Sequence, residues 1–534
     1  MASETIRNPI LPGFHPDPCV LRVGGVYYIA TSTFEWWPGV RIHASTDLVH
    51  WRHCAYAVTR RSQVDMRGVP CSGGIWAPAL SHDGERFHLV YSNVYHFARP
   101  HKDVENFLIT AENIEGPWSD PVRLNGVGFD PSLFHDSDGR KYLLQQLWDP
   151  RPGKNHFAGI TLQEYDPEAR GLVGERKLIF HGTQLGCTEG PHLYRINGWY
   201  YLVTAEGGTS WNHAVTVARS HAPVGPYEVC PHNPVLTAHG FPDSPLRKTG
   251  HGSLVQTDDG AWWMAHLCAR PLEGNFCVLG RETALQPVEW TDDGWPRIPA
   301  QGPVPSLRWS VHGRPAPDTA DTSPANPAWA GFSDQLAKGP LGPEWNTQRE
   351  PADDSWLGWA RGRGLVLRGR QSLSCRYRQS LVACRLRHFR ARVAVQMEFD
   401  PQNFMHSAGL AFFYNTEGYL YLRLSRGDDG TARWQIIQCR QTEVTYLLES
   451  EIDAASSPVW IQGGMRDGRA QFHQSADGIE WSPVGGGIDA RFLSDEGALV
   501  YGFTGCYIAL AAEDLSGGGR PAVFRDFTYT PDPA

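Results

Sequence analysis

Three acidic residues, one tryptophan and one histidine occupy the same place in five repeated segments of the sequence. Each segment contains a turn glycine followed by a run of aromatic and aliphatic residues. The side chains in question lie eight or nine residues before that glycine: Asp17, Trp76, Asp130, Glu189 and His251. One carboxyl group in such a position is explained well enough as a turn residue. Three acids in register favour a shared functional site.

The chemistry best suited to such a cluster is cleavage of a glycosidic bond. One protonated carboxyl group gives its proton to the leaving oxygen, and a second, ionised carboxylate either activates water or attacks the sugar. A third carboxylate raises the pKa of the acid and holds its orientation. A tryptophan offers a flat apolar face to a sugar ring. The five side chains therefore predict a glycoside hydrolase and leave open the choice between the two mechanisms.

The segments that must position these residues are all of strand type. Intervals of 59, 55, 59 and 62 residues separate the five turn glycines, Gly25, Gly84, Gly139, Gly198 and Gly260. Each glycine begins the second strand of a predicted hairpin, as in Gly198-Trp-Tyr-Tyr-Leu-Val. Five all-β units of this length predict a five-bladed β-propeller. Rotation about the propeller axis brings the starts of the inner strands, and with them the five side chains, to one funnel.

A second domain is expected because 534 residues are too many for one ordinary core. A stretch rich in Pro, Ser, Thr and Asp follows the fifth unit and predicts a linker. Beyond it, alternating segments such as Tyr419-Leu-Tyr-Leu-Arg-Leu predict a two-sheet sandwich. We therefore expect an all-β chain with a propeller catalytic domain over residues 1–312, a linker over 313–327 and a β-sandwich over 328–534.

Composition excludes several classes of function. The chain has 57 acidic and 48 basic residues, a formal charge of -9, which is a poor match to nucleic acid. The sequence contains no run of 18 apolar residues, so no membrane-spanning helix is predicted. The eleven cysteines are scattered without a C-x-x-C pair, which argues against a disulfide framework or a zinc site. Because the first residues also lack the apolar core of a signal peptide, we expect a cytoplasmic protein.

Seven ordered motifs resemble those of glycoside hydrolase family 43. Together with the C-terminal sandwich they point to its two-domain β-xylosidase branch. The motifs are Phe14-His-Pro-Asp17-Pro, Thr31-Ser-Thr-Phe-Glu-Trp-Trp-Pro-Gly, Gly74-Ile-Trp76-Ala-Pro, Gly128-Phe-Asp130-Pro-Ser, Thr188-Glu189-Gly-Pro-His, Gly250-His251-Gly-Ser and Leu279-Gly-Arg281-Glu-Thr. The resemblance covers nearly the whole chain and implies a five-bladed propeller and hydrolysis with inversion at the anomeric carbon.

The resemblance also implies a role for each matched residue. Asp17 would be the general base, Glu189 the general acid, and Asp130 the modulator of the acid's pKa. Arg281 would bind substrate hydroxyls. The pocket for the terminal sugar would have three aromatic walls: Phe34, Trp76 and Trp148. In Gly502-Phe-Thr-Gly-Cys-Tyr507 a sandwich loop would close over the funnel, with Tyr507 narrowing the pocket; the alternative is that Tyr507 only packs inside the sandwich.

We expect no cofactor to be required and no metal ligand in the site. His251 either binds a metal or water above the channel, as in relatives, or hydrogen-bonds within the funnel, and one histidine is a weak metal signal. A calcium site occurs in some family members where acidic residues precede a Phe. This chain has Ala330-Gly331-Phe332 there, which weakens that expectation despite Asp526. Ten arginines between Arg361 and Arg392 favour a solvated sheet face or a subunit contact over an anion-binding function.

The leading hypothesis is an exo-acting enzyme that releases xylose from the non-reducing ends of short β-1,4-xylo-oligosaccharides. An α-L-arabinofuranosidase, or an enzyme with both activities, uses the same three acids, and the sequence does not rank these. A non-catalytic sugar-binding propeller would not need three carboxylates. A retaining fructosidase would use Asp17 as a nucleophile. Apart from the oligosaccharide we expect no nucleic-acid or membrane partner, and we expect a homo-oligomer.

Overall fold

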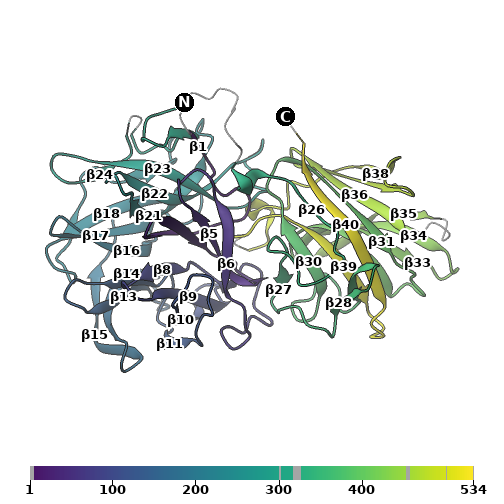
Figure 1. Ribbon diagram of the computed structural model, residues 1–534, viewed down its shortest axis with the longest axis horizontal. Helices are drawn as coiled ribbons and strands as arrows, with labels where there is room; N and C mark the ends of the chain where they lie inside the picture. The colour runs from purple at the N-terminus through teal and green to yellow at the C-terminus, as the bar shows by residue number, and fades with distance from the viewer. Residues whose placement is uncertain (1–4, 300–301, 317–325, 453–457, 501, 533–534) are drawn as a thin grey trace.

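Strands make up almost all of the regular secondary structure. The computed structural model describes residues 5–299, 302–316, 326–452, 458–500 and 502–532. Two single-turn 3-10 helices, η1 (Pro327–Trp329) and η3 (Asp495–Gly497), are the helical elements of these ranges. The expectation of an all-β chain is therefore confirmed. Figure 1 shows the N-terminal strands, purple to teal, on the left and the C-terminal strands, green to yellow, on the right.

Each of the five predicted units forms an antiparallel sheet of its own. The first three sheets contain β2 (Cys19–Val23), β3 (Val26–Thr31), β5 (Gly39–Ser45) and β6 (Arg52–Val58); then β7 (Gly74–Ile75), β8 (Ala79–His82), β9 (Phe87–His96), β10 (Asp103–Ala111) and β11 (Val122–Asn125); then β12 (Ser132–His135), β13 (Lys141–Trp148), β14 (Phe157–Asp166) and β15 (Gly171–Phe180).

The fourth and fifth sheets complete the N-terminal half. They contain β16 (Glu189–Ile196), β17 (Trp199–Glu206), β18 (Ala214–Ser220), β19 (Glu228–Val229) and β20 (Leu236–Thr237); then β21 (Arg247–Gln256), β22 (Trp262–Ala269), β23 (Glu282–Trp290) and β24 (Pro296–Arg297). The short β1 (Thr5–Arg7) pairs with β25 (Arg308–Ser310), so the two ends of this half of the chain are joined by a strand pair.

Two stacked sheets form the C-terminal half. One contains β26 (Phe332–Asp334), β28 (Leu357–Ala360), β29 (Gly364–Arg368), β31 (Arg390–Glu398), β36 (Val459–Arg466), β37 (Arg469–Ser475), β38 (Ser482–Asp489) and β40 (Pro521–Pro531). The other contains β30 (Ser380–Arg385), β32 (His406–Asn415), β33 (Gly418–Arg426), β34 (Ala432–Arg440), β35 (Glu443–Glu451) and β39 (Tyr507–Asp514). The predicted β-sandwich is thus present.

The sandwich sheet that contains β32 is buried on both faces. Leu410 and Phe412 belong to the apolar core between the two sandwich sheets. Their neighbours Ala411 and Phe413 belong to a second apolar cluster, which also contains Phe14 and other residues of the N-terminal half. Because successive strand residues point to opposite faces, a strand covered on both sides needs a continuous apolar run. The continuous apolar run that begins at Leu410 is therefore explained by a strand that is covered by the second sandwich sheet on one face and by the N-terminal half on the other.

Backbone pairing also crosses the interface. The two-residue strand β4 (Trp36–Trp37) pairs with β27 (Thr347–Gln348) from the C-terminal half. The Trp36 ring stacks on Tyr507, with the ring centroids 3.7 Å apart. Both rings are fully buried. The two halves are therefore joined by a small two-stranded sheet, β4 with β27, as well as by the linker. Linker residues 317–325 lie outside the described ranges.

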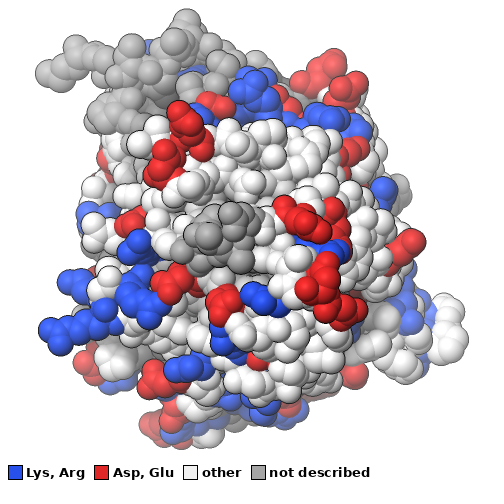
Figure 2. All heavy atoms as spheres, turned by 90° about the vertical axis from the view of Figure 1, so that its right-hand side faces the viewer, with Lys and Arg blue, Asp and Glu red and all other residues white. Residues whose placement is uncertain are grey.

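Charge is distributed evenly on the far end of the sandwich. Figure 2 shows acidic and basic side chains interspersed on the described part of this face. Within the arginine-rich stretch, Arg361 and Arg392 are exposed, as expected for a solvated face. Arg385 and Arg387 are buried against the N-terminal half, so the prediction of a solvated face or subunit contact is wrong for these two. No helix among the described residues is long and apolar enough to cross a bilayer.

A buried ion pair gives the first prediction. Lys248 Nζ, from β21, lies 2.5 Å from Glu496 Oε1 and 3.5 Å from Asp495 Oδ2 in the sandwich turn η3. Breaking a buried pair leaves uncompensated charge and costs about 3–5 kcal/mol. We expect Lys248→Met to lower the free energy of unfolding by that order, measured by chemical denaturation.

Arg297→Met is the matched control. Arg297 pairs with Glu289 at 3.1 Å, but both side chains are more than half exposed, at 62% and 51%. Exposed pairs contribute about 0–1 kcal/mol. Equal losses for the two variants would contradict a stabilising role for the buried pair at the interface.

Candidate active site

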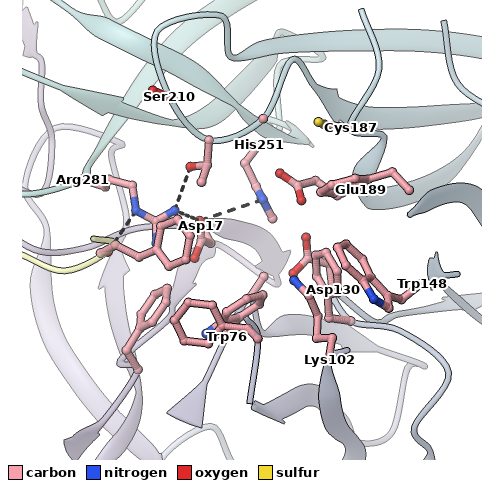
Figure 3. A pocket seen from close by; sticks show the side chains of 18 of the residues that line it. Asp17, Trp76, Lys102, Asp130, Trp148, Cys187, Glu189, Ser210, His251 and Arg281 are labelled. Atoms are coloured by element: carbon pink, nitrogen blue, oxygen red, sulfur yellow. Dashed lines mark hydrogen bonds and ion pairs between the residues drawn. The ribbon is translucent and has the colours of Figure 1, made fainter. Parts of the chain in front are cut away.

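One pocket gathers the five residues that the repeat pattern singled out. Asp17, Trp76, Asp130, Glu189 and His251 all line it. Figure 3 shows the three carboxyl groups facing a common space, with the His251 ring between Asp17 and Glu189. Three further residues expected from the family resemblance also line the pocket: Phe34, Trp148 and Arg281. The structure thus brings together side chains separated by more than two hundred residues of sequence.

Three of these residues share an unusual left-handed backbone conformation. Asp17, Asp130 and His251 have φ angles of 54°, 53° and 50°. Such left-handed conformations are uncommon and unfavourable for residues other than glycine, and they cluster at functional sites. Asp17 and Asp130 each stand two residues before the first strand of a sheet, β2 and β12. The shared conformation supports the structural equivalence that the sequence alignment of the units predicted.

Asp17 is held as a carboxylate. Its Oδ1 accepts a hydrogen bond from Arg281 Nη1 at 2.9 Å, and its Oδ2 accepts one from Ser32 Oγ at 2.6 Å. His251 Nδ1 lies 4.0 Å from Oδ1. Burial opposes ionisation, but Arg281, His251 and the Ser32 hydroxyl outweigh it and leave the pKa of Asp17 below its ordinary value. At neutral pH this group carries a negative charge and no proton.

Glu189 and Asp130 behave in the opposite way. Burial is the main cause that raises the pKa of Glu189 to about 7; Lys102 lowers it and the charge on Asp17 raises it. Burial and the proximity of Glu189 also raise the pKa of Asp130 well above its ordinary value, although Asp130 Oδ2 accepts a hydrogen bond from Gly190 N at 3.1 Å. Two such groups titrate as a pair. The pair therefore retains a proton near neutral pH, beside a carboxylate that does not.

Lys102 is a cation that acts on both members of this pair, and no sequence pattern marked it. It lies in a loop before β10, outside the aligned hairpins. Its Nζ is 4.5, 4.0 and 4.4 Å from the ring centroids of Trp76, Phe129 and Trp148. Burial lowers its pKa to about 8, while Glu189 and Asp130 act to raise it. An ammonium group surrounded by aromatic faces is stabilised by their quadrupoles, so Lys102 balances the acids from an apolar slot.

The sandwich supplies one wall of the pocket through Phe503. Arg281 Nε donates to the carbonyl of Phe503 at 3.0 Å, and the Phe503 amide donates to Ser72 Oγ at 3.1 Å. Gly280 permits this approach, because a Cβ there would lie 2.4 Å from the Thr504 carbonyl oxygen. Phe503 stands four residues from the aromatic residue that the resemblance suggested.

Tyr507 needs a correction in this respect. It was expected to narrow the pocket, but it is fully buried, stacks on Trp36 and does not line the pocket. The alternative, that Tyr507 only packs inside the sandwich, does not describe its position either, because its ring belongs to the apolar cluster between the two halves. The aromatic residue of the Gly502-Phe-Thr-Gly-Cys-Tyr507 loop that reaches the pocket is Phe503.

His251 contacts the Asp17 side of the pocket and packs against Gly190. A Cβ on Gly190 would lie 2.9 Å from the His251 ring, so only glycine allows the ring to sit there. Among the described residues no group of three His, Cys, Asp or Glu side chains is arranged to hold a metal ion. The expectation that the active site contains no metal ligand stays a prediction. The weak expectation of a calcium site near Asp526 is also untested.

Sequence reasoning missed several other pocket residues. They are Ala77, Phe97, Arg99, Lys102, Phe129, Phe157, Cys187, Gly208, Thr209, Ser210 and Phe503. Phe129 and Phe503 had a usable signal, because each lies inside a motif that was singled out for a neighbour. Thr209 and Ser210 lie in a loop between strands, and no pattern marked them; Thr209 Oγ1 accepts a hydrogen bond from Arg281 Nη1 at 3.0 Å.

Comparison with known proteins agrees with both halves of the chain. The family model of glycosyl hydrolases family 43 matches residues 6–296, and the model of the beta xylosidase C-terminal concanavalin A-like domain matches residues 333–530. A xylosidase/arabinosidase from Humicola insolens is 45% identical, with 98% of each chain covered. A xylan 1,3-beta-xylosidase from a Vibrio species is 41% identical, with 99% of each covered.

A solved structure is similar over the same length. The xylan beta-1,4-xylosidase from Bacillus halodurans superposes with a TM-score of 0.93 at 47% identity, covering 98% of this chain and 100% of that one. Sequence and structure comparisons therefore agree on the pairing of a propeller-type domain of family 43 with a concanavalin-like sandwich.

The charge of Lys102 provides a test of the site's electrostatics. Because a nearby cation stabilises a carboxylate, replacing Lys102 removes the largest charge effect that lowers the pKa of Glu189. We expect Lys102→Met to raise the pKa assigned to the Glu189–Asp130 pair. Carbon-13 NMR titration of labelled carboxyl groups measures this directly.

Arg99→Met serves as the matched control for this titration. Arg99 also lines the pocket, but it is not among the charges that act on Glu189. Its replacement should leave the titration of the pair nearly unchanged. A lower pKa in the Lys102 variant, or equal shifts in both variants, would contradict the assigned electrostatics.

Proposed function

Because this chain belongs to glycosyl hydrolases family 43, we propose that it releases xylose from the non-reducing ends of short β-1,4-xylo-oligosaccharides. It is a glycoside hydrolase. The observation that carries the proposal is the division of protons in the pocket: Asp17 is held ionised, whereas the pair Glu189 and Asp130 retains a proton near neutral pH. A glycosidase needs one carboxyl group of each kind.

The proposed reaction uses these groups in one step. Asp17 takes a proton from a water molecule as that water attacks the anomeric carbon. Glu189 gives its proton to the glycosidic oxygen as the bond to the leaving sugar breaks. The result is inversion at the anomeric carbon, since water and leaving group act on opposite faces. Asp130 helps to keep the proton on the pair, and Arg281 orients Asp17 through its hydrogen bond.

The pocket also accounts for cleavage at a chain end. Phe34, Trp76 and Trp148 provide flat apolar walls suited to a sugar ring. Phe503 adds a wall from the sandwich. Arg281 Nη2 is buried and has no hydrogen-bond partner among the described residues, which leaves a donor for a sugar hydroxyl. A pocket closed by a second domain accepts the terminal sugar of an oligosaccharide rather than the middle of a polymer.

The architecture proposed for the catalytic half is a five-bladed propeller, with boundaries at residues 1–312, 313–327 and 328–534. One inner strand from each of the five sheets supports this, because these strands contact one another in a closed cycle. β2 contacts β8 and β21, β12 contacts β8 and β16, and β16 contacts β21. A closed cycle of inner strands places their mouths around one axis.

A second candidate activity is hydrolysis of α-L-arabinofuranosides, alone or beside β-xylosides. The relative named xylosidase/arabinosidase favours it. Another relative is named xylan 1,3-beta-xylosidase, so the preference between β-1,3 and β-1,4 bonds also has to be measured. A non-catalytic sugar-binding protein is disfavoured, since it does not need three carboxyl groups. We propose a cytoplasmic enzyme, in keeping with eleven cysteines that are all free, and one that requires no cofactor. The homo-oligomer stays a prediction.

The activity is tested with xylobiose and a panel of aryl glycosides. We expect release of xylose from xylobiose and a higher kcat/KM for the aryl β-xyloside than for the aryl α-L-arabinofuranoside. A β-1,3-linked xylose disaccharide in the panel shows which of the two linkages is cleaved with the higher kcat/KM. Asp17→Asn, purified in parallel, controls for contaminating activity. Unchanged xylobiose at high enzyme concentration would favour a binding protein.

The stereochemistry is tested by proton NMR of the first-formed product. We expect α-xylose from a β-xyloside, followed by slow mutarotation. β-Xylose as the first product would end the inverting proposal and favour a mechanism in which Asp17 attacks the sugar.

The roles of acid and base are separated by the leaving group. Xylobiose expels a sugar hydroxyl that needs a proton, whereas an aryl xyloside with an acidic phenol needs it much less. Glu189→Ala should cost about 10²–10⁴-fold in kcat/KM on xylobiose and distinctly less on the activated substrate. Asp17→Ala should damage both by similar large factors, because both need activated water. The reverse pattern would exchange the two assignments.

A further inference from the structure

Three buried arginines meet at the domain interface, near the segment that carries Asp17. Arg41 comes from β5, and Arg385 and Arg387 come from the end of β30 and the residues after it; all three are at most 6% exposed. Glu344 is their carboxylate partner, with Arg41 Nη2 at 3.3 Å and Arg387 Nη1 at 3.6 Å. Arg385 instead donates to the carbonyl of Phe14 at 2.8 Å and to Asn346 Oδ1 at 2.7 Å.

The charges in this cluster do not balance. Burial opposes ionisation of Glu344, but Arg41, Arg387 and Arg385 together lower its pKa to about 2, so it supplies one full negative charge. Within the described part of the chain, these three guanidinium groups therefore have one paired carboxylate, Glu344. Glu35 also acts on Tyr507, but burial raises its pKa. The two nearby histidines, His15 and His43, add no charge to the cluster. Burial, reinforced by the arginines, lowers the pKa values of His15 and His43, which leaves their rings neutral. Excess buried charge is unfavourable unless something compensates it.

Hydrogen-bond donors in the same cluster lack partners. Arg41 Nε, Arg385 Nη2 and Tyr507 Oη are buried and have no partner among the described residues. Arg385 lies over the Tyr507 ring, its Cζ 5.4 Å from the centroid, and Arg41 is close enough to act on the Tyr507 hydroxyl. A guanidinium N–H donates only. His15 Nε2 is an unpartnered acceptor in the same cluster, because His15 Nδ1 donates to the Pro12 carbonyl. Buried donors are normally satisfied, and one neutral acceptor cannot serve three of them. Because positive charge is in excess here, an acceptor that bears negative charge suits this set.

We propose that a monovalent anion of chloride size binds among Arg41, Arg385 and Tyr507 at the interface of the two domains. A halide accepts several N–H and O–H donors and brings no hydrogen that must find an acceptor. The anion offsets part of the excess positive charge. It also steadies Arg385, which holds the Phe14 carbonyl three residues before Asp17.

Halide exchange at constant ionic strength tests the site. The intact protein is prepared in sodium gluconate, and sodium chloride or bromide replaces the gluconate stepwise. The thermal unfolding midpoint should rise and saturate, because an ion that binds only the folded state stabilises it. Crystals grown with bromide should show an anomalous peak within hydrogen-bonding distance of Arg41 Nε and Arg385 Nη2. Water at that position, or a midpoint that follows ionic strength alone, would overturn the proposal.

Variants assign the halide effect to this site. Tyr507→Phe removes an unpartnered hydroxyl, so in gluconate it should be at least as stable as the parent, and its halide affinity should fall several-fold. Arg385→Met should abolish the halide response. Arg392→Met, which changes an exposed arginine of the same stretch, should retain it. If Arg385→Met does not fold, Tyr507→Phe and the bromide peak still decide; an unchanged response in Tyr507→Phe together with no peak would place any binding elsewhere.

Discussion

The protein has to keep one carboxyl group ionised and a proton on a neighbouring pair of carboxyl groups within the same buried pocket. Burial alone pushes every carboxyl group toward its neutral form, so the difference must come from local partners. Asp17 receives two hydrogen bonds, from Arg281 and Ser32, and its pKa falls. Glu189 is buried, with Lys102 as the main positive charge that acts on it, and burial raises its pKa to about 7. The rest of the structure serves this asymmetry.

The sandwich takes part in it directly. Arg281, which keeps Asp17 ionised, is itself held by the carbonyl of Phe503 from the sandwich. Phe503 also excludes water from one side of the pocket, which strengthens the electrostatic differences inside. The two-sided burial of β32 and the stacking of Trp36 on Tyr507 hold the two halves together around this contact. The C-terminal domain is therefore a component of the active site, and removing it would alter the titration of Asp17.

The domain interface buries an excess of positive charge. The arginines that fasten the two halves bring more positive charge than Glu344 compensates. Arg385 nevertheless contacts the backbone of the segment that carries Asp17. A bound anion would reconcile strong hydrogen bonding with the burial of these charges, and would link the ionic conditions to the stability of the domain contact rather than to the chemistry itself.

The sequence by itself determined the all-β fold, the repeated units and the convergence of Asp17, Asp130 and Glu189. It could do so because a regular spacing of turn glycines implies equivalent positions around an axis, and chemistry restricts which side chains can be placed there. Tertiary structure alone decided the place of Lys102, whose slot exists only where rings from separate sheets meet. It also decided that Phe503, and not Tyr507, lines the pocket. Phe503 lies in the loop before β39, whereas Tyr507 is the first residue of that strand and stacks on Trp36. The sequence does not show this difference, because the contact with Trp36 joins residues far apart in the chain.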